Sequence, residues 1–115
     1  MKIAVVGSRE FKDKEFVENM MPEILRTGKY QLISGGARGV DSWAEGMAKF
    51  LGCECIIFKP DWDKYGKRAG FLRNELIINE ADKVVAFWDG ESKGTKHSID
   101  LAIKAGKPID IYVRK

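Results

Sequence analysis

Five short runs rich in β-branched and aromatic residues alternate with four stretches of helical spacing, and this alternation limits the possible fold more than any other feature. The runs lie at 2–6, 30–34, 54–58, 83–88 and 109–113, and the helical stretches at about 13–27, 41–51, 70–81 and 95–105. The middle runs are almost continuously apolar, as strands buried on both faces are. The pattern predicts an α/β fold, namely a three-layer α/β/α Rossmann-like arrangement with a five-stranded parallel sheet.

The short connections favour right-handed β-α-β units that begin near the centre of the sheet and wind outward in both directions. This predicts the strand order 3-2-1-4-5, in which the first and fourth strands are neighbours at the point where the winding reverses. Sheets of this kind bind ligands there, outside the carboxyl ends of the strands. The length of 115 residues is typical of one domain, so residues 1–115 are expected to form a single Rossmann-like domain. In the third helix, Leu72 and Leu76 are expected on the inner face.

Eight of the twelve glycines fall in the connections that lead from a strand to a helix. In a parallel sheet these connections gather at one edge, whereas the turns at the opposite edge are short and have no clustered polar motif. This asymmetry predicts a ligand site at the carboxyl edge of the sheet. The eight are Gly7, Gly35, Gly36, Gly39, Gly66, Gly70, Gly90 and Gly94.

The stretch ISGGARGVD at 33–41 is the richest of these connections. Its glycines lead into a helix N-terminus, where unpaired N–H groups and the helix dipole favour an anion. The stretch lacks the Lys-Ser/Thr of a P-loop and does not read GxGxxG. A Cβ at Gly36 is expected to block the approach of a ligand to the backbone. The candidate ligand-binding residues here are Gly35, Gly36, Arg38, Gly39 and Asp41.

Two of these side chains have open roles. Asp41 either caps the following helix or accepts a hydrogen bond from a ribose hydroxyl, and the capping-box spacing of Ser42 and Glu45 competes with the first role. Arg38 faces either a phosphate or the solvent.

The first and fourth connections add hydroxyls and a guanidinium. In GSREF at 7–11, Gly7 permits a sharp turn, Ser8 offers a hydroxyl, and Arg9 presents a planar fork suited to phosphate or carboxylate. In DGESKGTKHS at 89–98, a small anion-cradling turn is expected, with Thr95 as N-cap of the last helix and His97 as a solvated or structural residue. The candidate ligand-binding residues of the fourth connection are Ser92, Gly94 and Thr95.

The third connection, at 59–75, is longer. Trp62 and Tyr65 form either a lid or base-stacking surface, or simply anchor their own loop. Arg73 and Asn74 near the start of the next helix can hold a phosphate or hydroxyls and are further candidate ligand-binding residues.

The charge balance suits a small anionic ligand better than a nucleic acid. The formal net charge is +3 with no block of like charges, which is less than a dedicated nucleic-acid-binding surface needs. Cys53 and Cys55 are expected to be reduced. Because the chain has only one histidine, too few ligands are available for a metal ion, so no metal site is expected. No cofactor is expected either. No signal peptide or membrane span is read, so a cytoplasmic protein without a membrane partner is expected.

The chain resembles the SLOG superfamily in four motifs that occur in this order: GSR, SGGARGVD, AGFLRNELI and SKGT. This superfamily groups Smf/DprA DNA-processing proteins with LOG-type phosphoribohydrolases. The size and the loop PDWDKYGKRAGFLRN are most similar to its short YspA-like branch. The resemblance implies a Rossmann-like fold, a site for a nucleotide or nucleotide-derived ligand, and a homodimer.

One departure separates the chain from LOG-type enzymes. Their PGGxGTxxE pattern has a catalytic glutamate three residues after the threonine, where this chain has Ser98. We therefore expect binding of a nucleotide-like molecule, such as a purine nucleotide or an ADP-ribose-like compound, by a sensor or carrier. The alternatives are a hydrolase that uses a different carboxylate (Asp41, Glu75 or Asp89) and a DprA-like module that binds single-stranded DNA. No catalytic residue is assigned.

Overall fold

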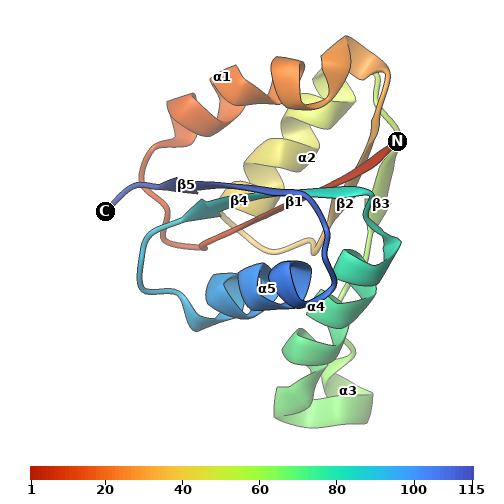
Figure 1. Cartoon of the computed structure of the whole chain (residues 1–115), viewed down its shortest axis with the longest axis vertical. Helices are drawn as coiled ribbons and strands as arrows, with labels where there is room; N and C mark the ends of the chain where they lie inside the picture. Colours follow the sequence, from red (N-terminus) through yellow and green to blue (C-terminus); the bar gives the residue numbers. More distant parts are fainter.

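The computed structural model describes residues 1–27 and 29–115, and Gly28 only as the end of a 3-10 turn; over these residues a five-stranded sheet lies between two helical layers (Figure 1). All strand pairs are parallel, in the order β3-β2-β1-β4-β5, which confirms the predicted topology. The elements are β1 (Lys2–Gly7), α1 (Lys14–Ile24), η1 (Arg26–Gly28), β2 (Gln31–Ser34), α2 (Val40–Phe50), β3 (Cys55–Ile57), α3 (Trp62–Tyr65), η2 (Gly66–Arg68), α4 (Ala69–Glu80), β4 (Lys83–Trp88), α5 (Lys93–Lys104) and β5 (Ile109–Val113).

The two faces of the sheet pack against different helices because neighbouring strand residues point in opposite directions. In β1, Ile3 and Val5 belong to the core beneath α1 and α2, whereas Ala4 and Val6 belong to the core above α4 and α5. Figure 1 shows these helix pairs on the two sides of the sheet. A strand with apolar residues at every position therefore stabilises both layers at once.

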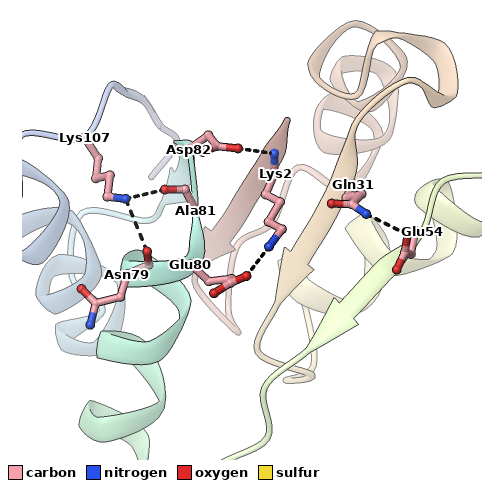
Figure 2. A network of polar contacts seen from close by, with 8 residues as sticks. All are labelled: Lys2, Gln31, Glu54, Asn79, Glu80, Ala81, Asp82 and Lys107. Carbon is pink, nitrogen blue, oxygen red and sulfur yellow. Dashed lines mark hydrogen bonds and ion pairs between the residues drawn. The ribbon is translucent and has the colours of Figure 1, made fainter.

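The amino edge of the sheet is held together by polar contacts (Figure 2). The Lys2 side chain pairs with Glu80 at the end of α4, and its backbone N–H donates to Asp82 at 2.8 Å. The Lys107 ammonium donates to the carbonyl oxygens of Ala81 at 2.7 Å and Asn79 at 3.4 Å, two acceptors at the C-terminal end of α4. These contacts fix the end of α4 that lies farthest from the carboxyl edge.

Several details differ from the sequence-based expectations. The first helix ends at Ile24 rather than near residue 27, because Arg26 and Thr27 adopt left-handed φ angles of 51° and 49°. In α4, Leu72 is half-buried and Leu76 is exposed, so the expectation that they form the inner face was wrong; Ile77 and Ile78 occupy it.

The third connection is not an open loop. It contains the short helix α3, which begins after Asp61, whose side chain accepts a hydrogen bond from Lys64 N at 3.2 Å. Figure 1 shows α3 beyond the first turns of α4, projecting away from the sheet. Residues 62–68 thus form a short helical segment outside the three layers.

Candidate functional site

A cavity of about 540 Å³ lies at the carboxyl edge of the sheet, where the ends of the neighbouring strands β1 and β4 meet. This is the position at which open α/β sheets bind ligands, and the volume lies within the range of small-molecule sites. All four strand-to-helix connections contribute to its lining. Of the thirteen predicted residues, ten line the cavity: Gly7, Arg9, Gly35, Arg38, Asp41, Arg73, Asn74, Ser92, Gly94 and Thr95.

The three predicted residues outside the lining are Ser8, Gly36 and Gly39. Ser8 is buried and accepts a hydrogen bond from Asp89 N at 3.1 Å, so it joins the first connection to the fourth. Gly39 has a φ of 75°, and a Cβ there would lie 2.6 Å from the carbonyl oxygen of Arg9, so glycine is needed for the contact between the first two connections.

Gly36 also has a structural position. Its φ is 70°, and a Cβ there would lie 3.0 Å from a side-chain carbon of Ile57. The expectation that a side chain at Gly36 would block a ligand is therefore not supported by its position, because a Cβ there would meet β3. Substitution of Gly36 is expected to strain the backbone instead.

An oppositely charged pair, Asp41 and Arg73, meets beside Gly35 in the site. The Arg73 Nη1 group donates to the Gly35 carbonyl at 2.6 Å, and Asp41 accepts from Ala37 N at 3.2 Å. A Cβ at Gly35 would lie 2.5 Å from Arg73 Nη1 and 3.0 Å from Asp41 Oδ2, so both charged groups flank this glycine closely. Because Gly35 has no side chain, the Asp41 carboxylate of α2 and the Arg73 guanidinium of α4 can both lie beside it.

Burial disfavours both charges of this pair. It raises the pKa of Asp41 to about 6, although the hydrogen bond from Ala37 and the charge of Arg73 partly oppose this effect. Burial also lowers the pKa of Arg73; Asp41 opposes the change, and the like charge of Arg9 adds to it. A carboxyl group with a pKa this close to neutrality in a cleft is a feature of functional sites.

The helix-capping expectations for this region were wrong. Helix α2 begins at Val40 with Gly39 as its N-cap, so Asp41 lies inside the first turn and its carboxylate serves the preceding loop. The Glu45 carboxylate accepts from the Ser34 hydroxyl at 2.6 Å rather than closing a capping box with Ser42.

The fourth connection is ordered by its own polar groups. Ser92, not Thr95, is the N-cap of α5, and its hydroxyl oxygen accepts from Thr95 N at 3.4 Å. Asp89 accepts from the backbone N–H groups of Glu91 and Ser92 at 2.9 and 2.8 Å. Burial raises the pKa of Asp89, but these hydrogen bonds outweigh burial and hold it below its usual value. Hydrogen bonds within the chain itself therefore fix the shape of this turn.

The two other arginines of the cavity differ from each other. Both are exposed, but Arg38 forms an ion pair with Glu10, which also lines the cavity. Arg9 lines the same cavity, and its charge acts on Arg73. Three guanidinium groups, those of Arg9, Arg38 and Arg73, thus face one space, with Asp41 as the carboxylate beside Arg73.

Asn74 connects Arg73 to α5. Its side-chain oxygen accepts from Arg73 Nε at 3.0 Å, and its amide nitrogen lies 3.4 Å from the Gly94 carbonyl and 3.3 Å from Nδ1 of His97. His97 also packs edge-on against Phe71, with ring centroids 4.6 Å apart. The expectation of a structural role for His97 agrees with these contacts.

Some lining residues were not among the predicted site residues. Trp62 was considered only as one of two alternatives, and Phe71 and Ser98 were not predicted as lining residues, although Ser98 replaces the glutamate of LOG-type enzymes. Tyr65 does not line the cavity, and Trp88 packs partly buried against the core with its indole N–H donating to the Ser92 carbonyl at 3.0 Å. Asp89, named above only as an alternative carboxylate, and Gly70, one of the glycines that predict the site, also line it. The remaining lining residues, which were not predicted, are Val6, Glu10, Ala37, Lys67, Ile77 and Glu91.

Metal ligation and membrane insertion find no support in the part of the chain that the structure describes. Across residues 1–27 and 29–115, no group of three or more His, Cys, Asp or Glu side chains is placed to hold a metal ion. Over the same residues, no helix has the length and apolar character needed to cross a membrane.

Comparison with known proteins identifies a family and a relative that covers most of the chain. The family model described as "YspA, cpYpsA-related SLOG family" matches residues 1–65. The Gene 61 protein of Mycobacterium phage D29 is 37% identical over an alignment of 116 positions, which covers 94% of this chain and 93% of the phage protein.

Solved structures share the fold. DNA processing protein A from Helicobacter pylori, whose structure describes a single-stranded DNA binding mode, aligns with a TM-score of 0.79 at 23% identity, covering all of this chain and 66% of that protein. The Streptococcus pneumoniae DprA structure aligns with a TM-score of 0.79 at 21% identity, covering 97% of this chain and 49% of its own. TM1055 aligns with a TM-score of 0.76 at 22% identity, covering 94% and 71%. The chain therefore spans two thirds or less of the two DprA proteins.

Proposed function

The chain belongs to the YspA, cpYpsA-related SLOG family, and from this premise we propose that it binds a nucleotide or nucleotide-derived small molecule at the carboxyl edge of its sheet. The ligand is a purine nucleotide or an ADP-ribose-like molecule, and the protein acts as a sensor or carrier. Residues 1–115 act as one Rossmann-like SLOG domain in this proposal.

The observation that carries the proposal is the pair of guanidinium groups, Arg9 and Arg73, facing one cavity. Their mutual repulsion is relieved when an anion lies between them, and a guanidinium binds phosphate through two parallel hydrogen bonds. Gly94 and Thr95 in the first turn of α5 line the same space, and helix N-termini favour anions. A phosphate group is the anion that this combination suits best.

Two arginine substitutions test the proposal, with AMP as the probe and titration calorimetry as the measurement. Arg9→Ala is expected to weaken AMP binding by about 10- to 100-fold, since a hydrogen bond to a charged group contributes about 1.5–3 kcal/mol. Arg38→Ala removes the same charge from the same cavity, but Arg38 is already paired with Glu10, so its loss should weaken binding less than about 3-fold. Equal effects of both substitutions, or no AMP binding by the parent protein, would contradict the proposal.

A second candidate function is binding of single-stranded DNA. Residues 62–68 include Lys64, Lys67 and Arg68 beside the exposed rings of Trp62 and Tyr65, a combination of cations and aromatics that nucleic-acid-binding surfaces use. Titration with an oligothymidylate at several salt concentrations tests it, because the affinity of phosphate-backbone contacts falls steeply with salt. Binding of AMP with a weak salt dependence would favour the small-molecule ligand.

We also propose that the protein is cytoplasmic and a homodimer. Support for the dimer comes from large apolar side chains that the single chain leaves exposed, among them Leu76 on α4 and Ile103 on α5, which are 55% and 60% exposed. These helices contact each other and form one outer layer of the molecule, so a second copy can cover both residues.

A further inference from the structure

Resting on the proposed function, we propose that the ligand carries a planar aromatic ring and that Trp62 and Phe71 form the surface on which this ring stacks. The two side chains are 51% and 49% exposed, and both line the cavity that contains Arg73. Large rings exposed inside a cavity, rather than scattered over a surface, offer a π-face to a ligand.

Both rings are held in place by neighbours. Phe71 packs edge-on against His97, with an interplanar angle of 71°. A Cβ added at Gly70 would lie 3.5 Å from Cη2 of Trp62, an ordinary van der Waals distance, so the edge of the indole lies beside the start of α4. A ligand ring therefore meets a surface that is already ordered, which lowers the entropic cost of binding.

The aromatic surface and Arg73 belong to one cavity. Gly70, which lies beside the Trp62 indole, and Arg73 are three residues apart on α4, and both line the cavity. Three residues of helix correspond to a backbone rise of about 4.5 Å, so both positions lie near the same end of α4. A sugar connects the base and the phosphate of a nucleotide, so one ligand can reach both groups. A ligand with its phosphate at Arg73 and Arg9 therefore places its base at Trp62.

The neighbouring aromatic residue on α3 provides a matched control. Tyr65 is 42% exposed and belongs to the same four-residue helix as Trp62, but it does not line the cavity. A base-stacking role thus applies to Trp62 and not to Tyr65, whereas a general role of exposed aromatics on α3 would involve both.

The test compares AMP with ribose 5-phosphate, which has the same sugar and phosphate but no base. We expect the parent protein to prefer AMP by at least about 5-fold, the lower end of the range for stacking of one base. Trp62→Ala should remove this preference by weakening AMP binding, with less than about a 2-fold change for ribose 5-phosphate. Trp62→Phe should keep the preference, and Tyr65→Ala should change neither affinity.

Three results would overturn the inference. Equal binding of both compounds by the parent protein would leave an anion site without base recognition, and the proposed function would survive in that coarser form. A Trp62→Ala variant that weakens both compounds by the same factor would give Trp62 a structural role only. If neither compound binds, the proposed function itself fails, and the inference fails with it.

Discussion

The strongest single prediction concerns Asp41, because burial of its carboxylate makes the stability of the protein depend on pH in a known direction. Asp41 is 7% exposed, and its pKa is about 6 in the folded protein against an ordinary value of 3.8. The folded state therefore binds the proton more tightly than the unfolded state does. The stabilisation from Asp41 is complete below pH 3.8 and is lost as the pH rises through about 6.

The magnitude follows from the same two values. At 1.36 kcal/mol for each pH unit, the difference between about 6 and 3.8 corresponds to about 3 kcal/mol in all, of which about 2 kcal/mol is lost between pH 4 and pH 7.5. Asp41→Asn keeps the shape of the side chain and removes its ionisation. The unfolding free energy of the variant minus that of the parent should therefore rise by about 2 kcal/mol from pH 4 to pH 7.5.

Urea unfolding of the parent and the variant at both pH values measures this change. Only the pH dependence of their difference matters, so a constant cost from weaker hydrogen bonds to the introduced amide does not affect the result. Asp63→Asn, which removes a carboxylate from the exposed helix α3, is the control and should keep the difference within about 0.5 kcal/mol. An Asp41→Asn difference that stays constant or falls as the pH rises would refute the reasoning.

Three further predictions concern binding, chemistry and assembly. Arg73→Ala should cost about 1.5–3 kcal/mol of AMP binding by calorimetry, and unchanged binding would exclude Arg73 from the phosphate site. The parent protein should release adenine from AMP no faster than buffer, because the buried hydroxyl of Ser98 supplies neither a negative charge nor a base; clear release, measured by chromatography, would instead indicate another carboxylate. Sedimentation at high micromolar concentration should give a dimer, and a monomer with and without AMP would contradict the assembly.

The sequence predicts the sheet and the position of the site because both depend on the order of elements. Five apolar runs separated by helices leave few topologies, and the glycine-rich connections then meet at one edge. Ten of the predicted residues line one cavity for this reason. The functional roles of these residues remain predictions.

Details that depend on side-chain packing could not be predicted in the same way. In the run LRNELII, apolar residues occur at several phases of the helix, so the periodicity alone did not distinguish Leu76, which is exposed, from Ile77, which is buried. The role of Gly36 depends on its contact with Ile57 of β3, and that of Gly39 on its contact with Arg9. Both partners are distant in the sequence, so these contacts are known only once the fold is known. Ser92 and Thr95 both have side chains suited to an N-cap, and the hydrogen bonds of Asp89 fix the turn that selects Ser92.

The central place of β1 has a consequence for the synthesis of the protein. β1 is made before the other four strands of this sheet, yet Lys2 meets Asp82 across a separation of 80 residues, and β1 pairs with β4 from Ile3 to Gly7. Until Trp88 has left the ribosome, one side of the first strand has no partner, and its N–H and C=O groups form an open edge. The nascent chain therefore pairs both sides of β1 only after β4 has been made, and fragments that end before β4 should aggregate.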